Sequence, residues 1–134
     1  MNHKGFLSRD ITVHDMIALK GDIHHIFPKE YLKPNGYKRE EYNQIANYAM
    51  TQQEINIKIG KKSPKDYLSV VLNQCKGATP VYGGIDDINT FRKNLEENCV
   101  PEDTCNMEAR DYRLFLEKRR ILMSKKIREY YNSL

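Results

Sequence analysis

Two adjacent histidines, His24 and His25, are the residues of this sequence best suited to chemistry. They lie in residues 22–28, between an Asp-Ile pair and an Ile-Phe-Pro run. If residues 23–27 form a short strand, the two imidazoles face opposite sides, because neighbouring side chains of an extended chain alternate. One histidine then binds a metal ion while the other faces a substrate held by that metal. We therefore expect metal-assisted chemistry at this stretch.

The pattern resembles the ββα-metal finger of HNH endonucleases over roughly residues 21–62. In that family a strand ends in a metal ligand, followed at once by a general-base histidine. An asparagine comes later, and a His or Asn ligand lies nine residues beyond it on a helix, as Asn47 and Asn56 do here. The resemblance implies that His24 and Asn56 bind the metal. It also implies catalytic roles for His25, as the base, and for Asn47, which orients the base or pins the loop.

The chemistry that this resemblance implies is hydrolysis of a DNA phosphodiester bond. Histidine has an intrinsic pKa suited to activating water near neutral pH, and a cation neutralises the charge that builds on the phosphate. Colicin-type members carry another histidine four residues after the helix ligand, where this chain has Gly60. One imidazole, one amide oxygen and open positions suit Mg²⁺ or Mn²⁺. Zinc is less expected, because it usually takes more nitrogen or sulfur ligands.

Charged residues near the motif have candidate supporting roles. Asp22 lies on the same strand face as His24. We expect it to accept a hydrogen bond that holds an imidazole tautomer, and direct contact with the metal is the alternative. Lys58, Lys61 and Lys62 surround the end of the predicted metal-bearing helix. They are candidates for contacts with DNA phosphates.

A second resemblance extends beyond the finger. Residues 6–12, 22–32, 42–47 and 54–56, together with residues 59–60, 64 and 67–68, look like the C-terminal nuclease domain of GmrSD-type restriction or anti-phage proteins. In those proteins a nucleotide-hydrolysing ParB-like domain usually precedes the nuclease, and it is not in these 134 residues. The resemblance therefore implies a fragment, or a stand-alone effector, of a restriction or anti-phage defence system.

Local signals predict the elements that position these residues. Capping patterns begin helices at Thr51 and Ser63, and prolines and glycines mark other element ends. Apolar spacing marks the buried faces, including a stripe from Tyr112 to Tyr130 with Lys and Arg on the other side of that helix. Helices are expected over residues 13–19, 28–32, 40–46, 51–60, from 63 onward, 86–98 and 107–131, and strands over residues 23–27 and 47–50. The predicted fold is α+β and mostly helical, with an HNH finger embedded in surrounding helices. We expect one domain, with the finger at about residues 21–62 and a C-terminal helical part at about residues 63–134.

Composition is that of a globular protein of 134 residues, with 40% hydrophobic and 30% charged residues. The sequence has no apolar run long enough to cross a membrane and no apolar leader segment. We therefore expect a cytoplasmic protein with no membrane partner. The three cysteines include no pair with the two-residue gap of a zinc site, which favours free thiols.

Charge is unevenly distributed along the chain, whose net charge is +4. Residues 29–65 and residues 106–134 each carry eight Lys or Arg against four Asp or Glu. Residues 66–105 carry three basic residues against seven acidic ones. Positive charge around the histidines and on the last predicted helix suits a polyanion such as DNA. Two solvated helical faces would give the same pattern.

Two alternatives to a nuclease stay open at this point. A basic helical DNA-binding module without catalysis would be unaffected by His25→Ala. An interaction or structural domain with histidines packed in its core would not bring His24 and Asn56 together. Under the nuclease hypothesis these two side chains must approach within roughly 4–5 Å, because ligands lie about 2.1 Å from a shared cation.

Overall fold

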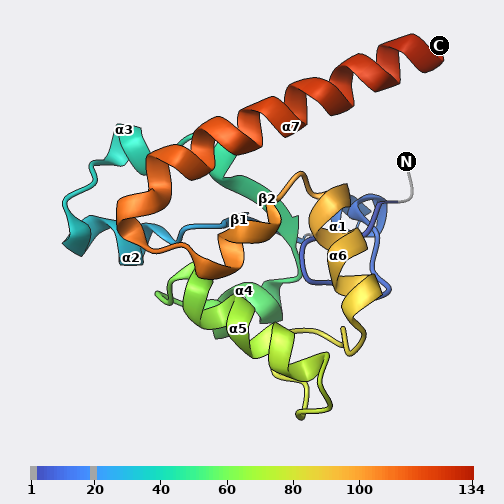
Figure 1. Cartoon of the computed structure of the whole chain (residues 1–134), viewed down its shortest axis with the longest axis horizontal. Helices are drawn as coiled ribbons and strands as arrows, with labels where there is room; N and C mark the ends of the chain where they lie inside the picture. The colour runs from blue at the N-terminus through green and yellow to red at the C-terminus, as the bar shows by residue number, and fades with distance from the viewer. Residues whose placement is uncertain (1–2, 19–20) are drawn as a thin grey trace.

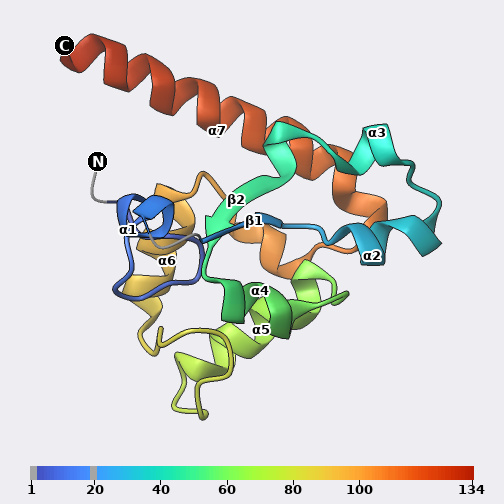
Figure 2. The same cartoon turned by 180° about the vertical axis from the view of Figure 1, so that it is seen from behind.

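A small two-stranded sheet lies at the centre of a mostly helical α+β fold. The computed structural model describes residues 3–18 and 21–134; Leu19, which ends the first predicted helix, lies outside these ranges. Strands β1 (Asp22–His25) and β2 (Tyr48–Thr51) pair antiparallel. Helix α7 covers one side of this hairpin, and helices α4 and α5 cover the other (Figure 1). The view from behind shows the same order (Figure 2).

The connection between the two strands is built from short helical turns. They are α2 (Lys29–Leu32), η1 (Lys33–Asn35), α3 (Arg39–Tyr42) and η2 (Ile45–Asn47). Pro28 caps α2 instead of occupying its first turn. The predicted helix over residues 40–46 is wrong in extent, because Asn43 adopts φ −90° and ψ 68° and ends α3. This break turns the Asn43 side chain toward the hairpin.

The strand register places the two histidines on opposite faces. His24 pairs with Ala49, and both are buried, whereas Ile23 on the other face is 61% exposed. Strand β1 ends at His25, two residues earlier than predicted. Beyond the strand, the Ile26 N–H donates to the Asn47 carbonyl, and the Phe27 N–H donates to the Asn47 side chain.

Helices α4 (Gln53–Ile59) and α5 (Pro64–Gln74) follow the hairpin, and α4 contacts β1. The predicted cap of α4 at Thr51 is wrong. The Thr51 hydroxyl donates to the Phe6 carbonyl, so Gln52 takes the cap position without a side-chain bond. The predicted cap of α5 is confirmed, because the Ser63 hydroxyl accepts a hydrogen bond from the Asp66 N–H.

The C-terminal half consists of α6 (Ile88–Glu97), two short turns and α7 (Tyr112–Ser133). The turns are η3 (Glu102–Asn106) and η4 (Ala109–Asp111). Helix α7 therefore begins five residues later than predicted. Its first half buries Phe115 and Leu116 in the core, but its second half projects beyond the body (Figure 1). The predicted apolar stripe is wrong there, since Ile127 and Tyr130 are 58% and 52% exposed.

Buried side-chain amides hold the loops around this core. The Asn94 amide oxygen accepts from the Leu7 N–H, and its nitrogen donates to the Ser8 carbonyl. The Gln74 amide oxygen accepts from the N–H groups of Val81 and Tyr82. Such bonds leave few backbone groups unpaired in the interior. The two segments meet where Gly83 lies against the Leu7 carbonyl and the Ile55 side chain.

Replacing Gly83 by alanine is expected to lower the free energy of unfolding by about 2–3 kcal/mol. Gly83 has φ +65°, and a Cβ there would clash with the Leu7 carbonyl oxygen. Gly77→Ala is the matched control, because Gly77 has φ +102° but no neighbour within 4 Å of its Cβ position. The control should lose only about 1 kcal/mol. Urea unfolding measures both, and equal losses would contradict the packing of Gly83 on Leu7.

The cysteines and the helices set two limits on function. Cys75, Cys99 and Cys105 are free thiols. Burial raises the pKa of Cys105 to about 11, so its thiolate is scarce at neutral pH. Within the part of the chain that the structure describes, no helix is both long and apolar enough to span a bilayer.

Candidate active site

His24 lies in an aromatic pocket beneath the hairpin. Its side chain is almost fully buried, with 2% exposure. The Phe6 ring stacks on it at a centroid distance of 5.6 Å, and the Tyr67 ring meets it edge-on at 6.0 Å. Phe6 is positioned by its backbone, whose N–H donates to the Met50 carbonyl at 2.8 Å. The N-terminal segment therefore fixes the ring of a predicted metal ligand.

The imidazole of His24 contacts the side chain of Asn56 on α4. Nδ1 of His24 lies 2.7 Å from the Asn56 amide oxygen. The Asn56 amide nitrogen donates to the Asp22 carboxylate at 3.2 Å. Asp22 thereby sets the orientation of the amide, since its nitrogen must face the carboxylate and its oxygen must face the ring. Asp22 thus supports a proposed ligand, as expected, but it holds the Asn56 amide and not an imidazole.

Burial keeps the His24 imidazole neutral. Its pKa is lowered to about 4, mainly by desolvation, while the Asn56 hydrogen bond acts in the opposite direction and the nearby charge of His25 acts in the same direction as desolvation. A neutral ring carries one proton and one lone pair, which is the form that binds metals. Nε2 of His24 is buried without a hydrogen-bond partner. In the contact with the Asn56 oxygen, Nδ1 carries the proton. Binding of a cation at Nδ1 would therefore require the proton to move to Nε2.

His25 is held on the opposite face by residues that the sequence did not single out. Its Nε2 lies 2.9 Å from the amide oxygen of Asn43. The rings of Tyr48 and Tyr42 meet it edge-on, with centroids 5.0 and 6.3 Å away. Segment 42–47 belongs to the region of family resemblance, but no spacing within it distinguishes Asn43. Only the end of α3 at Tyr42 reveals where the Asn43 side chain lies.

Asn47 pins the connection between the strands. It is fully buried, and its amide oxygen accepts from the Phe27 N–H at 2.8 Å. Its amide nitrogen donates to the carbonyls of Phe27 and Tyr42 at 3.0 and 3.1 Å. Of the two roles expected for Asn47, these bonds match loop pinning. The direct hydrogen bond to His25 comes from Asn43 instead.

The three candidate lysines are exposed but are not gathered at Asn56. Lys58 comes two residues after Asn56, so it projects about 200° around α4 from it. The Lys58 ammonium donates to the Val81 carbonyl at 3.4 Å. Lys62 donates to the Lys58 carbonyl at 3.2 Å, and Lys61 follows the end of α4. Lys58 therefore does not share the face of α4 that carries Asn56, and phosphate contacts from the three lysines stay a prediction.

The donor set at the hairpin fits a hard divalent cation. Nδ1 of His24 and Oδ1 of Asn56 are neighbours at 2.7 Å, within the limit expected for two ligands of one ion. The Asp22 carboxylate lies behind them and supplies negative charge. Among the described residues, no group of three or more His, Cys, Asp or Glu side chains is placed to hold a metal. A site with so few protein donors leaves positions for water and phosphate, as Mg²⁺ and Mn²⁺ sites usually do.

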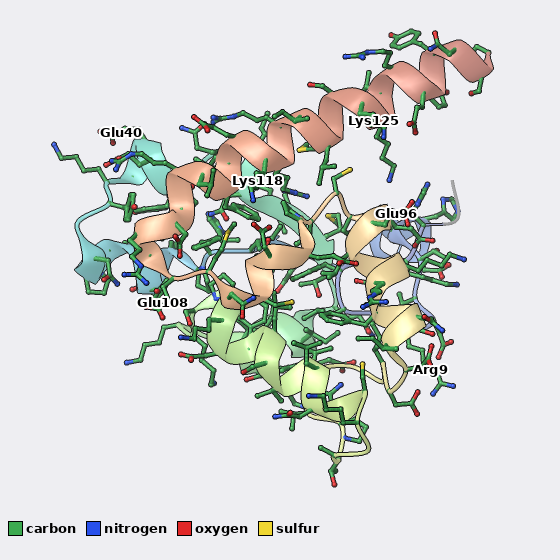
Figure 3. The ribbon with its side chains drawn as sticks, in the orientation of Figure 1. Arg9, Glu40, Glu96, Glu108, Lys118 and Lys125 are labelled. Atoms are coloured by element: carbon green, nitrogen blue, oxygen red, sulfur yellow. The ribbon has the colours of Figure 1, made fainter. Side chains whose placement is uncertain are left out.

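Arg119 on α7 supports the second strand from behind. It is 4% exposed, and one guanidinium nitrogen donates to the carbonyls of Ala46 and Tyr48 at 3.0 and 2.5 Å. Burial lowers its pKa to about 10, which still leaves it charged at neutral pH. The basic residues around Arg119 in the sequence suggested that it belongs to a solvated face. The structure buries it instead. Two other cations of α7 are labelled in Figure 3: Lys118, which pairs with Asp103 of η3, and Lys125, which is exposed.

Comparison with known proteins gave no match to a family model, to a curated protein or to a solved structure.

Proposed function

We propose that this protein is a divalent-metal-dependent endonuclease that hydrolyses DNA phosphodiester bonds, and that β1, β2 and α4 form a ββα-metal finger of the HNH type. The observation that supports it best is the contact between His24 and Asn56, which are 32 residues apart in sequence. His25, next in the chain, occupies the opposite strand face beside Asn43. In this arrangement one of two adjacent residues is the metal ligand and the other is the general base, on opposite faces of the strand.

Each residue has a defined part in the proposed reaction. His24 and Asn56 hold the cation, and Asp22 keeps the Asn56 oxygen turned toward it. A bound Mg²⁺ or Mn²⁺ would neutralise the negative charge that builds on the scissile phosphate. His25 accepts the proton of the attacking water. Asn47 acts through the backbone, because it fixes the segment that leads from His25 to the second strand.

DNA is the substrate that the charge distribution favours. The segment over residues 106–134 has eight basic against four acidic residues, and most of the projecting half of α7 is exposed. On the resemblance to GmrSD-type proteins, we propose a role in restriction or anti-phage defence in the cytoplasm. By the same resemblance, a nucleotide-hydrolysing ParB-like domain would act as the partner that controls cleavage.

A non-catalytic DNA-binding module is the second candidate. The exposed cations of α7, including Lys125, favour it independently of the histidines (Figure 3). Such a module would bind DNA equally well with and without a divalent cation. Metal-dependent strand cleavage therefore separates the two candidates.

Plasmid cleavage is expected to require Mg²⁺ or Mn²⁺ and to stop on addition of EDTA. Asn56→Ala should raise the metal concentration that gives half the maximal rate by about 10–100-fold, because it removes the amide oxygen beside His24. Asn73→Ala is the matched control, since Asn73 is an exposed helix residue on α5. Cleavage in EDTA, or an unchanged metal requirement in Asn56→Ala, would refute the proposed metal site.

A further inference from the structure

Asn43 is the one side chain of the described residues that the structure places in hydrogen-bond contact with His25. The Asn43 amide oxygen lies 2.9 Å from Nε2 of His25. An amide oxygen only accepts hydrogen bonds, so Nε2 must carry the proton in this contact. A neutral imidazole has one N–H, and its lone pair is then at Nδ1. The contact therefore selects which nitrogen of His25 is able to accept a proton.

The Asn43 side chain is held in place through its backbone. Its N–H donates to the Arg39 carbonyl at 3.0 Å, which closes the last turn of α3. The preceding carbonyl, that of Tyr42, accepts from the buried Asn47 amide at 3.1 Å. Asn47 thus reaches His25 indirectly, by fixing the peptide that precedes Asn43. This explains how a buried asparagine without contact to the base supports it.

Helix α7 anchors the same turn from the other side. The Tyr112 hydroxyl donates to the Glu41 carbonyl at 2.6 Å, and Arg113 pairs with the Glu41 carboxylate at 2.8 Å. The Tyr42 and Tyr48 rings close around the His25 imidazole. An exposed amide on a freely moving loop would exchange its partner for water. Here the turn that carries Asn43 is bonded to two buried side chains, those of Tyr112 and Asn47.

We infer that Asn43 is the positioning residue for the base: it holds His25 as the Nε2–H tautomer and leaves Nδ1 to take the water proton. The inference rests on the proposed nuclease function. In the reaction, the water oxygen forms a bond to phosphorus and the water proton moves to Nδ1. The bond from phosphorus to the leaving oxygen breaks, and that oxygen takes a proton from solvent. Nε2 keeps its proton throughout.

Nitrogen NMR of histidine-labelled protein measures the tautomer without any need for activity. The experiment uses metal-free protein at alkaline pH, where unperturbed histidines are neutral. The spectrum of His25→Ala identifies the His25 signals. We expect the Nε2–H form in the wild type and a mixture of both tautomers in Asn43→Leu, which removes the acceptor but keeps the volume. Asn35→Leu, at another exposed asparagine, should leave the His25 signals unchanged.

Kinetics of plasmid cleavage test the same contact in the reaction. Asn43→Leu should lower kcat by about 10–100-fold, with KM within about twofold of wild type, because Asn43 acts on the base and not on substrate binding. Asn43→Asp restores an acceptor oxygen at the same position and should recover most of the lost kcat. Asn35→Leu should match the wild type.

The two measurements separate failure of the inference from failure of the proposed function. An Nδ1–H tautomer in the wild type, or full kcat in Asn43→Leu, would overturn the role of Asn43 even in an active nuclease. A protein that never cleaves DNA but shows the Nε2–H tautomer, lost in Asn43→Leu, would support the contact and refute the nuclease.

Discussion

His25→Ala is expected to lower the rate of metal-dependent DNA cleavage by a factor of about 10²–10⁴. The imidazole is the proposed acceptor of the water proton, and alanine offers no substitute for it. His24 and Asn56 remain in contact on the opposite face of the hairpin, so metal binding should persist. The measurement is plasmid nicking in Mn²⁺ or Mg²⁺, together with Mn²⁺ binding by calorimetry.

The matched control for this substitution is His14→Ala. His14 lies exposed on the first helix and has no part in the proposed site. It should retain wild-type cleavage and wild-type metal affinity. Unfolding by urea checks that His25→Ala keeps its fold despite losing contacts with Tyr42 and Tyr48. Cleavage that survives in a folded His25→Ala variant would rule out the general-base role.

Asn47→Ala is expected to destabilise the fold by about 3–5 kcal/mol. The substitution leaves the Phe27 N–H and the carbonyls of Phe27 and Tyr42 without a hydrogen-bond partner in the interior. Each buried group without a partner costs about 1–3 kcal/mol. A loss of this size is a large part of the stability of a typical domain. Urea unfolding at neutral pH measures it from the shift of the midpoint at constant slope.

Two further variants make the Asn47 prediction specific. Asn47→Asp keeps an oxygen for the Phe27 N–H but faces a carboxylate toward two carbonyl oxygens, so it should be at least as unstable as Asn47→Ala. Asn35→Ala removes one exposed bond to the Tyr31 carbonyl and should cost less than about 1 kcal/mol. If Asn47→Ala were as mild as this control, the loop-pinning role would be wrong.

Local sequence signals predicted much of the secondary structure because they act over a few residues. Ser63 caps α5 as predicted, and both strands of the hairpin were expected near their observed places. The errors occur where a distant partner competes with a local signal. Thr51 has the sequence context of a helix cap, yet its hydroxyl bonds to Phe6, 45 residues away. Local pattern contains no information about such a partner.

The difference between local signals and distant partners also explains why the distal half of α7 is exposed. Its apolar spacing is typical of a buried face. Such a face is buried only if another element covers it. Phe115 meets Phe27 at a centroid distance of 4.8 Å, so the first half of the helix is covered. Ile127 and Tyr130 lie beyond the body and stay exposed. Conversely, Arg119 was counted as a surface cation although β2 and η2 enclose it.

The sequence by itself determined that His24 and His25 face opposite ways, because alternation is a local property of extended backbone. It also singled out Asn47 and Asn56 by their spacing, although their roles came from family resemblance. Only the tertiary structure decided which side chains form hydrogen bonds with these residues. Asp22 holds the Asn56 amide 34 residues away, and Asn43 reaches His25 across 18 residues. Those contacts depend on how the strand connection folds back on β1, which is set by buried hydrogen bonds between distant segments and not by any local pattern.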